Sequence, residues 1–212
     1  MMKIENGVLV ELDSNDIHSE ILCFPKEMID VSDEAWQWLT LPRPEVEQIV
    51  VEDGNPAFKS ENNCLIDIEN KTLALACKNS IIPTDDSVKI IGKCAFNGLD
   101  DLNSIEIPEN ITDIGYMAFA LCGLEEIVIP ESVENFEALC FGLNAQTLKK
   151  ITVKGKNTKI GNAAFGTYKE LQGFKHTAIM PEPIANTLTV CAPADSYAAR
   201  YAKEYDIDFE EI

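Results

Sequence analysis

The sequence predicts a β-rich repeat solenoid, and three recurring features point to this fold class. Phenylalanines recur at positions 96, 119, 141 and 165, with spacings of 23, 22 and 24 residues. Aliphatic residues alternate ahead of them, and a proline directly follows two of these alternations. A period of roughly 20–29 residues corresponds to one strand plus a return segment, and such a unit buries its apolar face only by stacking on its neighbours.

The clearest repeat spans residues 102–119 and reads Leu-x-x-Ile-x-Ile-Pro-x-x-Ile-x-x-Ile-Gly-x-x-Ala-Phe. Its alternation predicts a strand with Ile105 and Ile107 on one face and Ser104 and Glu106 on the other. The following proline, Pro108, cannot donate to a strand ladder, so it should end the strand. We expect the remaining apolar residues to point inward from a short return segment.

Further copies of this pattern lie on both sides of the clearest one. Residues 124–141 and 148–165 repeat it with substitutions, and residues 88–96 match its second half. A more diverged copy spans residues 24–51 and has Trp36 where the others have phenylalanine. The phenylalanines of successive copies are therefore expected to stack on one another in the core.

Two segments do not fit the plain repeat and are interpreted as inserted β-hairpins. Residues 64–75 contain two apolar runs separated by a polar turn at 69–72. Residues 7–12, followed by the polar residues 13–16, resemble the same device near the N-terminus. Because each hairpin precedes a repeat, we interpret the first 60 residues as a diverged copy of the next unit.

The C-terminal segment differs from the repeats. Asp195 or Ser196 can cap a helix, and residues 197–205 have a helical pattern. The motif Ile207-x-Phe209 follows as a short strand. This arrangement is typical of the terminal unit that shields the last rung of a solenoid.

The chain is therefore expected to have two parts. A solenoid covers residues 1–186, with a diverged N-terminal unit at 1–60 and regular repeats with the hairpin insert at 61–175, and a C-terminal cap covers 187–212. The chain has 212 residues, of which 46% are hydrophobic, so it is long enough to build a continuous core.

The repeat pattern over residues 88–165 resembles the BspA-like leucine-rich-repeat family. The segment 55–58 with the hairpin that follows it, and the ending 196–204, are also similar to elements of that family. The resemblance implies a right-handed leucine-rich-repeat stack with short return segments, inserted β-hairpins and a C-terminal capping helix. It also implies a recognition role, since known members include adhesins on bacterial surfaces.

Charge and hydropathy exclude several partners. The chain carries 17 Lys and Arg against 36 Asp and Glu, a net charge of −19. Nucleic acids and anionic membranes would be repelled, and no apolar run reaches the ~20 residues that span a bilayer. The N-terminal residues lack the apolar core of a signal peptide, so we expect a cytoplasmic location, with the cell surface or secretion as the alternative if an export signal has been removed.

The cysteines predict free thiols. There are seven, an odd number, and none forms a Cys-x-x-Cys pair, so neither a disulfide framework nor a zinc site is expected. Several lie among apolar residues and are interpreted as small buried hydrophobic side chains in a reducing compartment.

No catalytic, cofactor-binding or metal-binding constellation is apparent. The two histidines, His18 and His176, lie far apart in the repeat register. Acidic pairs such as Asp100-Asp101 are expected to be solvated surface charges. The segment 92–98 superficially suggests a phosphate-binding loop, but it lacks the Gly-Lys-Ser/Thr ending, and its glycine belongs to the repeat.

What remains is a surface made by the outward positions of the strands. Mixed polar and small apolar groups on a rigid sheet suit the binding of a protein or glycan, which is the leading functional hypothesis. The alternative is a structural or self-associating repeat unit with no small-molecule ligand, and an enzyme is not expected. The candidate binding residues are Gln48, Val50, Ser104, Glu106, Glu126, Val128, Lys150 and Thr152.

Overall fold

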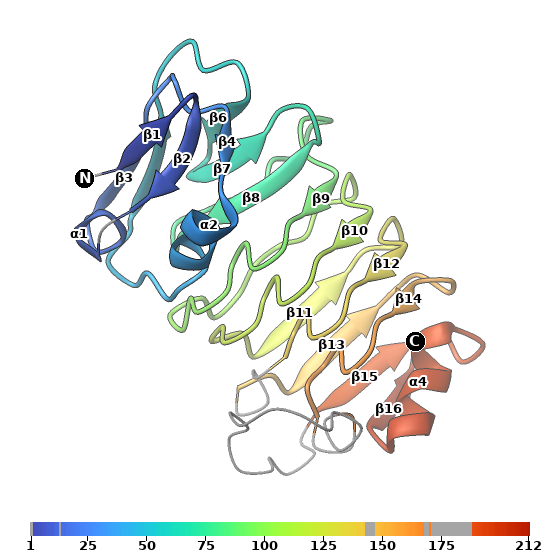
Figure 1. Cartoon of the computed structure of the whole chain (residues 1–212). Helices are drawn as coiled ribbons and strands as arrows, with labels where there is room; N and C mark the ends of the chain where they lie inside the picture. The colour runs from blue at the N-terminus through green and yellow to red at the C-terminus, as the bar shows by residue number, and fades with distance from the viewer. Residues whose placement is uncertain (1, 13, 143–146, 168–169, 171–187) are drawn as a thin grey trace.

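The computed structural model describes residues 2–12, 14–142, 147–167, 170 and 188–212, and they form an elongated stack of rungs (Figure 1). The regular rungs each contribute a two-residue strand to a back row, and the rungs that begin with β11 (Glu126–Ile129) and β13 (Lys150–Val153) also contribute a longer strand to a front row. Strands of successive rungs pair in parallel, as expected when every rung runs the same way round the stack.

The front row consists of two separate parallel sheets. One has two strands and the other has four, in the order β11-β13-β15-β16. We call the surface formed by these strands, together with residues 103–107 between the two sheets, the strand face. The strands are β3 (Ile21–Phe24), β5 (Gln48–Val51), β11 (Glu126–Ile129), β13 (Lys150–Val153), β15 (Thr189–Ala192) and β16 (Asp208–Glu211).

The back row is a seven-stranded sheet that includes the central hairpin. Four two-residue strands pair in parallel, and β8 joins them by pairing with β9. β7 pairs antiparallel with both β6 and β8. The strands are β6 (Phe58–Glu61), β7 (Cys64–Asp67), β8 (Thr72–Ala76), β9 (Ile90–Ile91), β10 (Asp113–Ile114), β12 (Asn135–Phe136) and β14 (Lys159–Ile160).

The same strand order occurs at the N-terminus. β1 (Lys3–Glu5) pairs antiparallel with β2 (Val8–Glu11), which pairs in parallel with β4 (Asp30–Val31). This repeats the arrangement of β7, β8 and β9. The sequence analysis misplaced the turn, which lies at residues 6–7 ahead of the second strand, whereas residues 14–17 form the short helix α1 (Ser14–Ile17).

The diverged copy replaces the tight turn of the repeats with a helix. α2 (Asp33–Leu39) begins at Ser32, whose side-chain oxygen accepts a hydrogen bond from the main-chain nitrogen of Ala35. Trp36 is half-buried and packs against the N-terminal core. It therefore contributes to the core from a helix, not from the rung position that the phenylalanines occupy.

The repeat phenylalanines form the centre of the larger core. Phe96, Phe119, Phe141 and Phe165 are all buried, as predicted. The ring of Phe119 lies between those of Phe96 and Phe141, with centroid distances of 4.9 and 5.4 Å and nearly parallel planes. Aromatic pairs at this separation stabilise the core beyond the area that they bury, so these contacts help to hold successive rungs together.

The stacking changes at the C-terminal end of the column. Phe165 meets Phe136 and Tyr201 edge to face, with centroid distances of 6.4 and 5.5 Å. The expectation that every phenylalanine stacks on the next is therefore wrong for Phe165. The reason is the aromatic side chain at position 136, whose edge-on contact with Phe141 competes with continued stacking.

The C-terminal end is closed by a helix and a last strand. α4 (Tyr197–Tyr205) begins at Ser196, whose side chain accepts a hydrogen bond from Ala199 N, so Ser196 rather than Asp195 caps the helix. β16 follows and pairs in parallel with β15. Ala198, Tyr201 and Ala202 are buried against the last rung.

One predicted strand does not form. Residues 103–107 are not paired in a strand ladder, although their side chains alternate as expected at the end of the segment, with Ile107 buried and Glu106 exposed. The main-chain bond from Glu125 N to Asn103 O, at 3.5 Å, is the only backbone link between this segment and the next rung in the described part of the chain. The prediction of a strand here is therefore wrong, and the front row is interrupted at this rung.

Candidate interaction surface

The structure places the eight predicted binding residues on the strand face but does not bring them all together. Gln48 and Val50 lie on β5, which pairs only with β3 in the described residues. Ser104 and Glu106 lie in the unpaired segment 103–107. The other four form two adjacent pairs on neighbouring strands, Glu126 beside Lys150 and Val128 beside Thr152.

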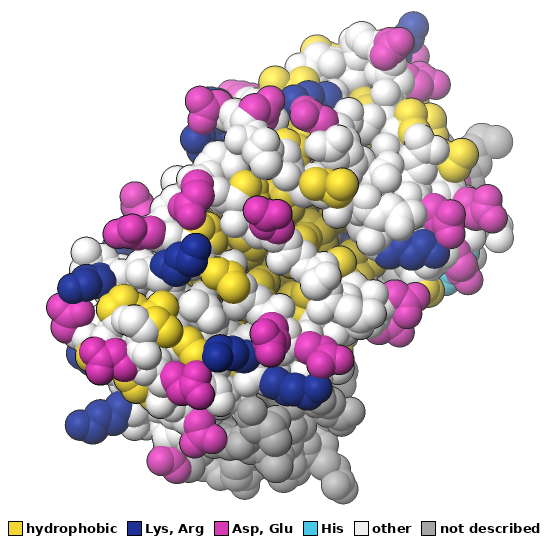
Figure 2. All heavy atoms as spheres, turned by 180° about the vertical axis from the view of Figure 1, so that it is seen from behind, with side chains coloured by type: hydrophobic (Ala, Val, Ile, Leu, Met, Phe, Trp, Pro, Cys, Tyr) yellow, Lys and Arg dark blue, Asp and Glu magenta, His cyan; other side chains and the backbone are white. Residues whose placement is uncertain are grey.

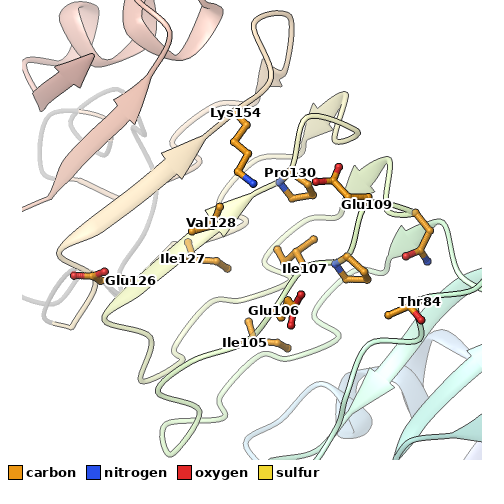
Figure 3. A pocket seen from close by; sticks show the side chains of 12 residues that line it. Thr84, Ile105, Glu106, Ile107, Glu109, Glu126, Ile127, Val128, Pro130 and Lys154 are labelled. Carbon is orange, nitrogen blue, oxygen red and sulfur yellow. The ribbon is translucent and has the colours of Figure 1, made fainter. Parts of the chain in front are cut away.

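A groove crosses the strand face where the front row is interrupted (Figure 3). Its volume is about 580 Å³, and it extends from Thr84 across residues 105–110 to β11. It contains three of the predicted binding residues, Glu106, Glu126 and Val128. The groove is therefore the most distinctive feature of the predicted binding surface.

The floor of this groove is apolar. Ile105 is partly buried and packs against the main core, while the Val128 side chain is 48% exposed. Pro108 and Pro130, which follow the strand positions of two successive rungs, complete the floor.

The face turned away from the viewer of Figure 1 carries apolar surface. Figure 2 shows hydrophobic side chains in a band along the middle of that face, with acidic and basic side chains on both sides.

Four charged side chains surround the floor without ion-pair partners. Glu106, Glu109, Glu126 and Lys154 line the groove, and none makes a salt bridge within the described residues. A charged residue next to the groove does form an ion pair. Glu125 pairs with Lys149 at 2.8 Å, and in consequence the pKa of the Glu125 carboxyl is lowered. The groove thus holds three carboxylates and one ammonium group that form no salt bridge with any described residue.

Main-chain groups of β11 also face the groove. The carbonyls of Glu125 and Ile129 accept hydrogen bonds from Lys150 N and Lys154 N of the neighbouring rung. In a parallel pair, alternate residues direct their peptide groups to opposite sides, so those of Glu126 and Val128 point toward residues 103–107. No hydrogen bond joins them to that segment in the described structure, since β11 is the edge strand of its sheet.

Glu109 and Lys154 were missed by the sequence analysis. Both follow the end of a strand position, so the alternation rule that selected outward residues did not reach them. Their positions in the repeat could have identified them, because each lies directly after a strand position: Glu109 follows Pro108, and Lys154 follows the last residue of β13. Asn110 fixes the turn beside them, because its side-chain amide donates to the carbonyls of Pro83, Asp85 and Val88.

A second cavity, of about 670 Å³, lies on another part of the molecule. Residues of α2, among them Trp36 and Asp33, form one wall, and Thr72 of β8 and Lys93 belong to the other. Asp67 on its rim is bound by the main-chain and side-chain nitrogens of Asn70. None of the predicted binding residues lies in this cavity.

The residues considered for catalysis remain scattered. His18 contacts the exposed Glu45 at 2.5 Å, and His176 lies outside the described residues. Among the described carboxyl groups, every resolved pKa displacement is a lowering caused mainly by a hydrogen-bonded Lys or Ser, as for Asp86 beside Lys89. A general acid needs the opposite displacement. In the same residues, no His, Cys, Asp and Glu cluster of three or more could hold a metal ion, and no helix could cross a membrane.

All seven cysteines are free thiols, and six of them are buried. Burial raises the pKa of the Cys64 and Cys122 thiols to about 12, so both are protonated at neutral pH. The interpretation of the cysteines as packing residues holds for these six. Cys23, on the outer side of β3, is exposed.

The stacked rungs, the two rows of parallel strands and the open face define a leucine-rich-repeat protein. The model of the BspA-type leucine-rich-repeat region matches residues 66–182 with six copies, which is more than half of the chain. The chain therefore belongs to the BspA-type leucine-rich-repeat family.

Solved structures show the same fold at low sequence identity. A leucine-rich-repeat protein from Eubacterium ventriosum is 20% identical, with a TM-score of 0.54 over 83% of this chain. The pneumococcal vaccine antigen PcpA is 18% identical, with a TM-score of 0.51 over 97% of this chain. The match spans 43% and 57% of the length of those two proteins. No curated protein matches the chain.

Proposed function

We propose that this protein is a non-catalytic binding module that recognises a protein or glycan through the strand face. The observation that carries the proposal is the groove at residues 105–130, which combines an apolar floor with charged side chains that have no ion-pair partners among the described residues. Binding sites are typically concave and mostly apolar, with a few polar groups that orient the ligand. Leucine-rich-repeat families serve mainly as interaction or structural modules, which is consistent with this role.

The solenoid supports this function by holding the binding groups rigidly. We propose that the rungs wind in a right-handed sense and that the two hairpins and α4 are the inserted and capping elements of the stack. The hairpin strand β8 pairs with β9, and α4 packs on the last rung. A surface fixed in this way loses little conformational entropy when a ligand binds.

The alternative is a structural or self-associating repeat unit. The outer edge of β16 favours it, because this strand ends its sheet and Phe209 is 39% exposed there. The net charge of −19 opposes it, since like-charged copies repel one another. Sedimentation over a range of protein and salt concentrations distinguishes the two functions: a binding module stays monomeric, whereas a self-associating unit forms chains as salt increases.

The proposal is tested by presenting the purified protein with a glycan array and a displayed random-peptide library. The Thr152→Arg variant should no longer bind these ligands, because it places a bulky cation on the half-buried outward position of β13. The matched control is Asn157→Arg, which introduces the same cation at an exposed turn residue outside the strand face. Ligands that bind both variants as well as wild type would contradict a role for the strand face.

A further inference from the structure

We infer that the groove at residues 105–130 binds an extended, lysine- or arginine-bearing segment of a partner protein. This inference rests on the proposed function and narrows it to one class of ligand and one part of the strand face. Three independent properties of the groove support it, namely its apolar floor, the main-chain groups along its edge and the sign of its unpaired charges.

The floor requires an apolar side chain in the ligand. Val128 is 48% exposed on a strand whose neighbouring positions Ile127 and Ile129 are buried, and Pro108 and Pro130 lie beside it in the same groove. Covering this surface removes apolar area from water, which is favourable by roughly 25 cal/mol for each Å². A uniformly charged or polar ligand would gain no free energy from covering this apolar surface.

The edge of β11 favours an extended main chain. The peptide groups of Glu126 and Val128 face the interruption of the front row, where residues 103–107 do not pair with them. A strand edge whose main-chain groups lack partners can accept an extended peptide through main-chain hydrogen bonds, while alternate side chains of the peptide enter pockets. A glycan could not reproduce that regular spacing of donors and acceptors.

The charges select a basic ligand. Glu106, Glu109 and Glu126 outnumber Lys154 in the groove, and none of the four forms a salt bridge among the described residues. Complementary charge steers association and rejects partners of the wrong sign. The same reasoning disfavours a second copy of this chain as the occupant, because each copy carries a net charge of −19.

The test measures binding of four fluorescent peptides, each about eight residues long, to the full chain by fluorescence anisotropy. The first alternates lysine and valine. The second replaces lysine with glutamate, the third replaces valine with serine, and the fourth carries N-methyl groups on the main chain. We expect the first peptide to bind at least about tenfold more tightly than each of the others, because each change removes one of the three contributions.

A matched pair of variants locates the site. The double variant Glu106→Gln and Glu126→Gln should weaken binding of the lysine–valine peptide about tenfold at low salt, since it removes two of the complementary charges. Glu125→Gln removes the same charge from the adjacent residue, which pairs with Lys149 outside the groove, and should change the affinity less than about twofold.

Several outcomes would overturn the inference. Equal binding of the valine and serine peptides, or equal effects of the Glu125→Gln variant and the Glu106→Gln, Glu126→Gln double variant, would mean that basic peptides associate with the acidic surface without using the groove. Absence of peptide binding, together with library or glycan ligands that depend on Thr152, would refute the basic-segment inference while leaving the proposed function of the strand face intact. If neither the peptides nor any library or glycan ligand binds, both the basic-segment inference and the proposed function of the strand face are refuted.

Discussion

The guanidinium group of Arg43 donates a hydrogen bond to the main-chain oxygen of Ala95, 52 residues further along the chain, with an Nη2–O distance of 2.6 Å. Arg43 is 1% exposed and also donates to the carbonyls of Leu39, Leu41 and Ala76. It therefore joins the end of α2 to the central hairpin and to the first regular rung. Burial lowers the pKa of Arg43 to about 10, so the side chain remains a cation at neutral pH.

Replacing Arg43 should weaken the junction between the N-terminal unit and the repeats. Arg43→Met removes a donor from four carbonyls, of which that of Ala95 keeps a bond from Ala76 N. We expect the free energy of unfolding to fall by about 3 kcal/mol, even though removal of a buried charge offsets part of the loss. Urea denaturation measures the change. Arg200→Met, at the exposed arginine of α4, is the control and should stay within about 0.5 kcal/mol of wild type. A similarly small effect at position 43 would show that the junction does not depend on this side chain.

Truncating the middle ring of the phenylalanine stack should be among the most damaging core substitutions. Phe119 is fully buried and lies between Phe96 and Phe141, so Phe119→Ala should cost about 3–5 kcal/mol of stability. Phe209→Ala, on the exposed strand β16, should cost much less. Both can be measured by thermal or chemical unfolding. A melting temperature within a degree or two of wild type for the first variant would disprove the stacked-core description.

Glycine should be favoured at one position where it is usually unfavourable. Met117 has a φ of 52°, and Cys94, Leu139 and Ala163 share this left-handed conformation in the equivalent turns. A side chain makes such a conformation cost about 1–2 kcal/mol. Met117→Gly should therefore be more stable than Met117→Ala by about 1 kcal/mol in urea denaturation. The reverse order, which is normal for glycine and alanine, would mean that the turn carries no such strain.

The phenol of Tyr201 should make stability depend on alkaline pH. Its hydroxyl donates to the buried carboxylate of Glu170 at 2.5 Å and accepts from Ala164 N. Tyr201→Phe should cost about 2 kcal/mol near neutral pH, because the carboxylate loses a donor. Tyr197→Phe, at an exposed tyrosine of the same helix, is the control.

The sign of the pH dependence follows from the direction of the pKa displacement. Burial, followed by the charge of Glu170, raises the pKa of Tyr201 above its ordinary value of 10.0. Above pH 10 the unfolded chain loses this proton while the folded chain keeps it, so stability falls as pH rises. The stability difference between wild type and Tyr201→Phe should therefore shrink between pH 10 and 11. A difference that is constant or grows with pH would contradict this assignment.

The thiols should fall into two classes of reactivity. Cys23 is exposed, whereas the other six cysteines are buried, and burial raises the pKa of Cys64 and Cys122 to about 12. Because the thiolate is the reactive form, a thiol reagent should modify one group rapidly in the folded protein and all seven in denaturant without reductant. Cys23→Ser should abolish the rapid phase. Recovery of fewer than seven thiols in denaturant would reveal disulfides and refute the prediction of free cysteines.

Local sequence patterns were enough to predict the repeat, its register and most of its core. The spacing of Phe96, Phe119 and Phe141 identified the column of buried rings, and the pattern around Ser196 identified the start of α4. These features depend on neighbouring residues within one rung, so the sequence of a single rung is enough to predict them. Outward positions such as Glu126 and Thr152 could be selected for the same reason, because strand alternation alone separates them from Ile127 and Ile151.

Only the tertiary structure decided where the front row breaks and which groups meet there. The segment around Ile105 has the same alternation as β11, yet it forms no ladder, because pairing depends on the distance between neighbouring rungs and not on the pattern within one. Glu109 and Lys154 come from different turns and line the same groove only in the folded stack. The bond from Arg43 to Ala95 likewise joins distant segments, and no local pattern marks a buried cation whose partners are main-chain oxygens.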